Sequence, residues 1–389
     1  MHPGKTVFSQ LLQWIHPEQF ARCVRRYRGD YKVRSFSCWD QFLCLVFAQL
    51  TFRESLRDIA TCLGVRSDLY YLGFRCPIIA RSTLAEANES RDWRIYADLA
   101  AVLIRRARKL YATEDIGLVI EQTVYALDAT TIDLCLSLFP WARFRTAKGA
   151  IKMNTLLDLR GPIPVNVHIT DGKTHEVRWL DLLTWEPGSI YLIDRGYLDF
   201  SRLHRITLSQ AYFVIRAKDR LRFCRLYSHP VDPGSQVRCD QTISLTGFYP
   251  AQDYPDTLRR IRFFDAENNR TLVFLTNHFG LPAEQIAALY RRRWQVELFF
   301  KWIKQHLRVK AFYGTSANAV KTQLWSAICT YALVMIMKKE LAVRHDLHTI
   351  FQLLSLHPFE KVPLAQLLTK TYDPNQISYD SNQLMFNYL

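Results

Sequence analysis

The 389-residue sequence predicts an α/β protein whose central strands follow a helical region and are interrupted by a second β-rich stretch. Three observations support this fold class. Apolar residues recur every three or four positions up to about residue 110, which is typical of helices. Runs of β-branched and aromatic residues then lie between residues 124 and 217. Short β-like runs separated by Pro, Gly and Asp fill the chain up to residue 280, where the helical pattern returns.

Residues 1–110 are predicted to form a helical N-terminal domain. Leu11, Leu12 and Ile15 show the helical spacing at its start. Segments 52–65 and 81–88 could form a DNA-reading pair of helices. A plain helical bundle fits the same pattern, and the connection between the segments is long for a helix-turn-helix, so both interpretations stay open.

Residues 111–217 are predicted to contain five strands and two helices. Three strands follow one another before strands and helices alternate, which indicates a mixed sheet with helices on it. The strands are expected at 124–134, 153–159, 164–170, 189–194 and 211–217, and the helices at 175–183 and 199–209.

Residues 218–280 are predicted to form a β-rich insertion, after which 281–345 return to helix and 346–389 form a C-terminal helical region. A helix is expected from 282 to about 307. The most apolar stretch, 324–337, is shorter than the roughly 20 residues that span a bilayer, so it is expected to be a buried core helix with no membrane partner.

Charge points to a polyanionic partner. The chain has 51 Lys and Arg against 36 Asp and Glu, a net charge of +15, which suits nucleic acid, although charge that serves only solubility could give the same total. Nine scattered cysteines without a Cys-x-x-Cys pair, and no signal peptide in the first residues, predict the reducing cytoplasm.

The helix predicted after the insertion has one polar face. At about 100° per residue, Tyr290, Arg293, Glu297 and Lys304 fall within an arc of about 60°, which Lys301 joins, while apolar residues line the opposite side. A generic basic amphipathic helix would show the same division. However, Glu297 is a lone acid among cations, and a carboxylate there can hold a metal ion while its neighbours bind phosphates.

Partners for this carboxylate must come from elsewhere, because two-metal phosphodiester hydrolysis needs several carboxylates at one point. Asp128 lies in the first predicted strand, and Asp194 ends the fourth, where the chain leaves the sheet. Taken singly, an Asp at a strand end is more often a helix cap or turn residue. Three rivals are ranked lower: Asp133, Asp158 and Asp171.

The pattern Tyr290, two residues, Arg293, three residues, Glu297, six residues, Lys304 resembles the Tyr-Arg-Glu-Lys signature of bacterial insertion-sequence DDE transposases, the insertion-sequence four family. The order of the two aspartates before this helix, the second in an IDRGY segment, is similar as well. The resemblance covers about residues 120–310. It implies a ribonuclease H-like catalytic core, a mixed five-stranded sheet with helices, formed by 111–217 and 281–345 around the insertion.

The resemblance also implies an activity: metal-dependent cleavage at transposon ends and transfer of the 3′-hydroxyl into target DNA, by cut and paste. The implied cofactors are two Mg²⁺ or Mn²⁺ ions per active site. Implied partners are double-stranded DNA, as terminal inverted repeats and target, and a second copy in a homodimer on DNA at the bacterial nucleoid. The metal would be held by Asp128, Asp194 and Glu297, and the DNA by Tyr290, Arg293, Lys304, Lys301 and Arg195.

One departure concerns the insertion. Members of the family that make hairpin ends stack a flipped base on a tryptophan there, whereas residues 218–280 contain no Trp and offer Phe248, Tyr249, Tyr254 and Phe263 instead. Two other functions fit the chain: a catalytically inactive DNA-binding regulator derived from a transposase, and a structure-specific ribonuclease H-like nuclease. The three intact carboxylates argue against the regulator.

Overall fold

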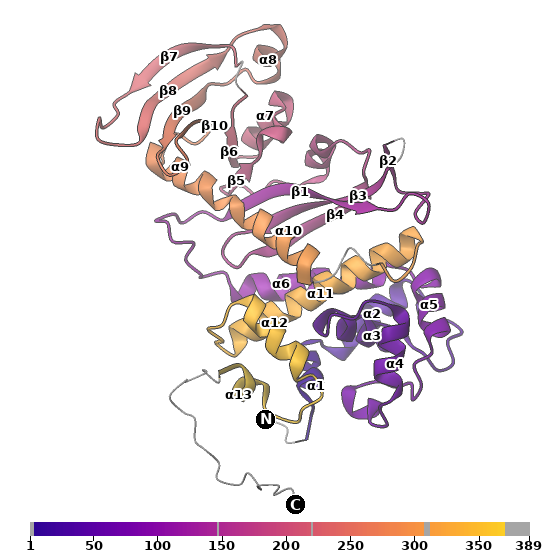
Figure 1. Cartoon of the computed structure of the whole chain (residues 1–389). Coiled ribbons are helices and arrows are strands. Elements are labelled where there is room, and N and C mark those ends of the chain that lie inside the picture. Colours follow the sequence, from indigo (N-terminus) through magenta and orange to yellow (C-terminus); the bar gives the residue numbers. More distant parts are fainter. Residues whose placement is uncertain (1–3, 146–147, 219–220, 307–311, 370–389) are drawn as a thin grey trace, which may run out of the picture.

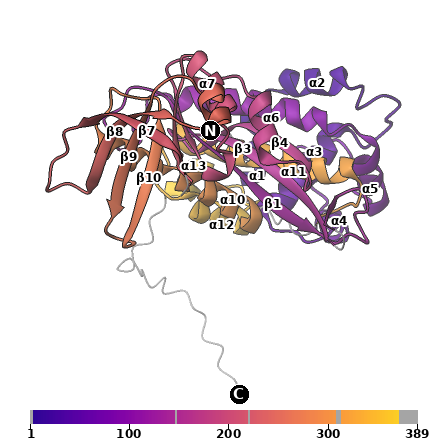
Figure 2. The ribbon, with the colours of Figure 1, turned by 90° about the horizontal axis from the view of Figure 1, so that it is seen from above.

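The structure is a computed structural model, and residues 4–145, 148–218, 221–306 and 312–369 are described here. The molecule is elongated (Figure 1). Helices from both ends of the chain form a body at one end, the first strands lie in the middle, and the insertion forms the other end. Seen from above, strands β7–β10 stand well apart from the N-terminal helices (Figure 2).

The described residues before 110 form helices and no strand. The capping box that starts α3 shows how local sequence sets these helices: Ser37 Oγ accepts from the Asp40 backbone N–H, and the Asp40 carboxylate accepts from the Ser37 N–H. The elements are α1 Val7–Leu11, η1 Leu12–Trp14, α2 Pro17–Arg26, α3 Cys38–Leu50, α4 Leu56–Gly64, η2 Leu69–Leu72, α5 Arg81–Ser90 and α6 Arg94–Leu110.

The two segments considered as a DNA-reading pair correspond to α4 and α5, which contact each other with the 3-10 turn η2 between them. The N-terminal helices share their core with the C-terminal ones, because α11 packs against both α3 and α6. The C-terminal elements are α11 Ala317–Glu340, α12 Leu347–Leu356 and α13 Leu364–Thr369; residues 370–389 of the predicted C-terminal region lie outside the described residues.

Helix α11 is the core helix that the sequence predicts. Its length and apolar composition would suffice to cross a membrane, but 89% of its most apolar window is buried inside the protein. Its buried residues pack into the main hydrophobic core. Packing within the protein therefore accounts for its apolar character.

All five predicted core strands are present. β1, β3 and β4 are antiparallel neighbours, while β5 and β6 continue the sheet parallel to β1. The short β2 was not predicted, and the segment predicted as a helix at 175–183 is the 3-10 helix η3. The elements are β1 Val124–Leu134, β2 Arg143–Arg145, β3 Lys148–Asp158, β4 Ile163–Asp171, η3 Glu176–Leu182, β5 Ile190–Ile193, η4 Arg195–Tyr197, α7 Phe200–Leu208 and β6 Tyr212–Arg216.

The insertion continues the core sheet, so the predicted five-stranded sheet is too small. β10 pairs antiparallel with β6, which gives ten strands in one sheet, in the order β2-β3-β1-β5-β6-β10-β9-β8-β7 with β4 on β3. The pairing covers the edge that β6 would otherwise expose. The insertion elements are β7 Phe223–His229, β8 Val237–Leu245, α8 Phe248–Asp253, β9 Leu258–Asp265 and β10 Arg270–Thr276.

The helix predicted from 282 to about 307 is two helices in the structure, α9 Ala283–Arg292 and α10 Trp294–His306. They join at Arg293, where two hydrogen bonds span three residues instead of four: Arg293 N–H to the Tyr290 carbonyl and Val296 N–H to the Arg293 carbonyl, both 3.1 Å. The predicted apolar side is confirmed, because Val296, Phe299, Phe300 and Ile303 are buried in the core.

Candidate active site

Asp128 and Asp194 are brought together by parallel strands. In the β1–β5 register Leu127 lies beside Ile193, and each aspartate is the next residue along. Asp128 is still within β1, whereas Asp194 follows β5 and caps the 3-10 helix η4 by accepting from Gly196 N–H at 3.1 Å. The two carboxylates therefore leave the sheet at adjacent positions.

Glu297 reaches the same place from α10, which packs across β1. Arg293 links it to the sheet. Its guanidinium donates from Nη1 to Asp128 Oδ2 at 2.8 Å and from Nη2 to Glu297 Oε1 at 2.5 Å. The side chains of Arg293 and Asp128 are only 14% and 18% exposed, so this bridge lies largely out of water. The fold thus gathers carboxylates from three separate segments around one cation.

Burial dominates the electrostatics of Asp128. It raises the pKa of this carboxyl to about 6, against the opposing effect of the Arg293 charge, and the negative charges of Asp194 and Glu297 add to the rise. An additional cation nearby would stabilise the ionised form of this carboxyl.

A metal ion would need further closure of the site. Within the described ranges, no three His, Cys, Asp or Glu side chains are already clustered as metal ligands. The donor chemistry nevertheless fits, because Asp128, Asp194 and Glu297 supply the hard oxygen ligands that Mg²⁺ and Mn²⁺ prefer. In the structure Arg293 occupies oxygens that such an ion would use.

A cleft of about 380 Å³ opens beside these carboxylates. It runs from Asp194 and Glu297 to the turn between β9 and β10, so the insertion forms one of its walls. Four arginines and four aromatic residues line it together with four carboxylates: Arg216, Arg270, Arg291 and Arg293; Phe263, Phe274, Tyr290 and Trp294; and Asp194, Asp265, Glu267 and Glu297. Such walls suit a phosphate-bearing ligand with flat rings.

The other predicted DNA contacts are spread more widely. Tyr290 lies in the cleft, packed on Phe274 with ring centroids 4.9 Å apart, and burial raises its pKa to about 12. Arg195 is exposed in η4, next to Asp194. Lys301 and Lys304 lie farther along α10 and are not among the residues that line the cleft.

The lower-ranked aspartates have other surroundings. Asp158 is buried in an ion pair with Arg108 and Arg160, and it pairs with Tyr125 at the start of β1, away from Asp128. Asp171 accepts hydrogen bonds from the Thr174 backbone and hydroxyl, as a turn residue does. Asp133 is exposed farther along β1.

Several residues near the site were missed in the sequence. Trp294 is 58% exposed on the cleft, and Arg216 ends β6 beside it. Tyr197 is fully buried, and its hydroxyl has no hydrogen-bond partner among the described residues. Burial raises the pKa of this hydroxyl, and the charges of Glu176, Asp128 and Asp194 add to the rise. Arg216 could have been predicted, because it lies at the end of a parallel strand, where ligand sites gather. Nothing in the local sequence pattern marks Trp294 or Tyr197.

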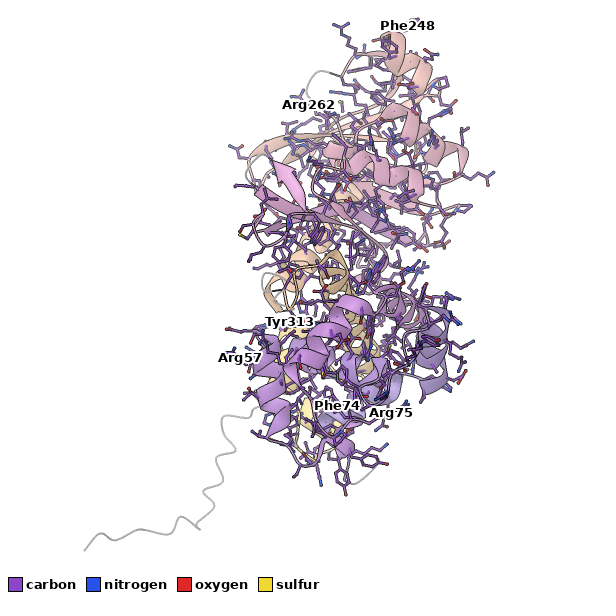
Figure 3. The ribbon with its side chains drawn as sticks, turned by 90° about the vertical axis from the view of Figure 1, so that its right-hand side faces the viewer. Arg57, Phe74, Arg75, Phe248, Arg262 and Tyr313 are labelled. Atoms are coloured by element: carbon purple, nitrogen blue, oxygen red, sulfur yellow. The ribbon has the colours of Figure 1, made fainter. Side chains whose placement is uncertain are left out.

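The four aromatic residues of the insertion that could replace the tryptophan differ in their exposure to solvent. Tyr254 and Phe263 are buried, although the edge of Phe263 belongs to the lining of the cleft. Phe248 and Tyr249 are exposed on α8, and Figure 3 shows Phe248 at the far tip of the molecule. Of the four, Phe248 and Tyr249 are the ones exposed to solvent, and their rings contact each other edge to face.

Two known protein families match parts of the sequence. Residues 120–333 match the family described as the transposase DDE domain, and residues 3–75 match a domain of unknown function. The first match spans both strands that carry the aspartates and the helices that carry Arg293 and Glu297.

Three bacterial relatives are named as transposases. The chain is 32% identical to transposase y4zB of Sinorhizobium fredii over 65% of its own length and 70% of the relative, and 29% identical to the transposase of insertion sequence IS5377 from Geobacillus stearothermophilus over 65% and 66%. It is 22% identical to the transposase of insertion sequence IS4SA from Synechocystis over 82% and 88%. Among solved structures, a piggyBac transposase synaptic complex with hairpin DNA aligns at 10% identity, with a TM-score of 0.43, over 93% of this chain and 77% of that one.

Proposed function

Since this chain belongs to the family of DDE-domain transposases and is a DNA transposase of the bacterial insertion-sequence type, we propose that it cleaves transposon ends and transfers their 3′-hydroxyls into target DNA by cut and paste. The observation that carries the proposal is the convergence of Asp128, Asp194 and Glu297 beside a cleft lined by arginines and aromatic rings as well as carboxylates.

The three carboxylates are proposed as the catalytic and metal-binding residues. DDE transposases depend on a divalent metal ion, generally Mg²⁺, and two such ions, Mg²⁺ or Mn²⁺, are proposed here. When bound, they supply activation of the attacking oxygen and stabilisation of the leaving one. Asp128 and Asp194 offer oxygens from fixed positions in the sheet, and Glu297 offers one from the first turn of α10.

The cleft is proposed to hold the transposon end. Arg293, Tyr290 and Arg216 line it directly and are proposed to contact the phosphates. Arg270 and Arg291 also line it, where they form ion pairs with Asp265 and Glu267. We assign Lys301, Lys304 and Arg195 to phosphates beyond the cleft, because these side chains lie outside its lining. A strand so held would have its scissile phosphate next to the carboxylates.

The proposed core is ribonuclease H-like. Three antiparallel strands, β1, β3 and β4, continued by β5 and β6 parallel to β1, support this proposal. We keep the proposed division into an N-terminal domain (1–110) that recognises the DNA ends, a core (111–217 and 281–345), an insertion (218–280) and a C-terminal helical region (346–389). Cleavage of paired ends would need a homodimer on DNA, acting in the bacterial cytoplasm at the nucleoid.

Cleavage of end DNA by purified protein tests the function. Double-stranded DNA carrying the element's terminal repeats is incubated with Mg²⁺ and target DNA, and products are separated on gels. Cleaved and joined products are expected with wild type and neither with Glu297→Gln. Cleavage without joining would identify a structure-specific nuclease, and tight binding without cleavage a regulator.

A further inference from the structure

We propose that Arg293 is a positioning residue that holds Asp128 and Glu297 together in the absence of DNA and keeps divalent cations from their oxygens until DNA phosphate draws it away. This inference rests on the proposed function of the same site. It concerns the state before DNA binds, in which the fold has already assembled the carboxylates.

Competition for the same oxygens is the first argument. Arg293 donates to Asp128 Oδ2 and to Glu297 Oε1, while Asp128 Oδ1 already accepts from the Ala129 N–H at 2.8 Å. A cation ligated by both side chains must share these oxygens with Arg293, or use Asp128 Oδ1 and Glu297 Oε2 beside a guanidinium charge that repels it. Charge-assisted hydrogen bonds of this kind, in a largely buried site, are strong enough to compete with a hydrated ion.

A phosphate in the cleft could serve as an alternative partner for Arg293. It lines the cleft that we assign to the transposon end, and its Nε is buried without an acceptor among the described residues. A phosphate in the cleft would satisfy that donor and offer a bidentate partner in exchange for the carboxylates. The short-range hydrogen bonds at the α9–α10 junction leave Arg293 outside a regular helical turn, where a small backbone change can reorient it.

Such an exchange couples the two ligands. If phosphate releases Arg293 from the carboxylates, DNA raises the affinity for metal, and metal raises the affinity for DNA by the same factor. The site would then load its ions where DNA is in place.

Mn²⁺ binding measured by electron paramagnetic resonance on the full chain tests this without catalysis. A short duplex lacking the transposon end provides phosphate without a cleavage site. In wild type the duplex is expected to raise Mn²⁺ affinity by about tenfold or more. Arg293→Gln is expected to bind Mn²⁺ about tenfold more tightly than wild type without DNA, and to respond little to the duplex.

Arg292→Gln is the matched control, since it removes the same charge from the adjacent position, where the side chain lies against the loop at Gly117. It should keep wild-type affinity and DNA dependence. Equal affinities in the two variants, or no effect of duplex on wild type, would overturn the proposal. If Arg293→Gln does not fold by circular dichroism, Arg293→Lys carries the test, because lysine keeps the charge but loses the two-armed bridge. A protein that binds Mn²⁺ as expected yet never cuts DNA would refute the proposed function instead.

A second, independent observation concerns the outer part of the insertion. We infer that one open face of strands β7, β8 and β9 binds the phosphate backbone of double-stranded DNA. Side-chain alternation and contacts put four arginines on this face: Arg225, Arg238, Arg260 and Arg262. Figure 3 shows Arg262 at the surface of this part of the molecule.

Two of these arginines lie over aromatic rings. The Arg260 guanidinium is 4.9 Å from the centre of the Phe223 ring, and that of Arg238 is 5.2 Å from the Phe264 ring. Stacking holds a flat guanidinium in place and leaves part of its edge available to phosphate, although Arg260 Nη1 also donates to Gln241 Oε1 at 3.0 Å.

No described strand residue on this face is acidic. The nearby strand carboxylates belong to the opposite face, where Asp240 pairs with Arg259. Helices α7 and α8 cover only the end of the face that lies near the core, where Ile243, Leu245 and Leu258 are buried. The remainder is a cationic surface with nothing in the described chain to neutralise it, and a polyanion fits it.

The salt dependence of duplex binding tests this surface. Each lost phosphate contact lowers the slope of log affinity against log salt by about 0.9, so Arg225→Gln with Arg262→Gln should lower it by about 1.8. The control removes two arginines of α7, Arg202→Gln with Arg205→Gln, whose partner is Asp181. An unchanged slope in the first pair, or the same fall in both, would contradict the inference, while cleavage by the wild type tests the proposed function separately.

Discussion

Arg293 donates a 2.8 Å hydrogen bond to Asp128, a residue 165 positions earlier in the chain, inside a site where both side chains are nearly buried. Breaking such a pair from one side leaves a charge in a poorly solvated place. Arg293→Met should therefore lower the free energy of unfolding by roughly 3 kcal/mol at pH 8 without metal. Urea denaturation measures it, and Arg292→Met, next to it, should cost less than about 1 kcal/mol. Equal losses would show that the bridge adds no stability.

Asp194 should matter for catalysis more than for folding. Its carboxylate is only partly buried and accepts a hydrogen bond from the Gly196 N–H, with no ion pair to it among the described residues. Asp194→Asn keeps an oxygen acceptor for that bond but loses a charged metal ligand, so cleavage should fall by at least about 100-fold. Asp133→Asn, an exposed carboxylate on β1, is the control and should cleave within about twofold of wild type. Gel assays with labelled end DNA give both rates, and comparable cleavage by the two variants would remove Asp194 from the site.

The insertion depends on a buried ion pair. Arg259 and Asp240 are 7% and 6% exposed, with two hydrogen bonds of 2.9 and 2.6 Å between them, and Arg259 also donates to the carbonyls of His278 and Leu281 before α9. Asp240→Asn should destabilise the protein by about 3–5 kcal/mol, because it leaves a buried arginine without its counterion.

The surface pair of Arg205 and Asp181 provides the comparison for that measurement. Arg205→Gln should cost no more than about 1 kcal/mol, since exposed pairs contribute little. Denaturation curves of both variants at one pH give the difference. A small loss in Asp240→Asn would mean that the insertion is held by its apolar contacts alone.

His278 should make stability depend on pH. Burial, together with the charge of Arg259, lowers the pKa of this histidine below its usual 6.5. The unfolded chain therefore takes up a proton at this histidine more readily than the folded chain does. The stability that neutral His278 contributes is present above pH 6.5 and is lost as the pH falls through the lowered pKa. His278→Gln should show a smaller loss of stability between pH 7.5 and pH 5.5 than wild type, in thermal melts. The exposed His175→Gln should behave as wild type, and a wild-type response in His278→Gln would contradict the assignment.

The elements with strong local patterns were predictable. β1 has the predicted bounds, 124–134, because its β-branched run is long and continuous. The apolar stripe of α10 and the core position of α11 followed from periodicity and length. Elements of three to seven residues, such as β2, α8 and the 3-10 helix η3, have too few residues for a period to show.

The sequence by itself determined the order of the main strands and helices and the polar face that carries Tyr290, Arg293 and Glu297. It also predicted Asp128 and Asp194 as partners of Glu297, and the structure places these two aspartates at adjacent positions. Only the tertiary structure decided that β10 pairs with β6 to make one sheet, that the signature helix is broken at Arg293, and that Arg293 joins Asp128 to Glu297. The physical reason is that periodicity and capping act within a few residues. Strand pairing and a buried ion bridge depend on segments that meet only when the whole core packs, and no local pattern records which segments those are.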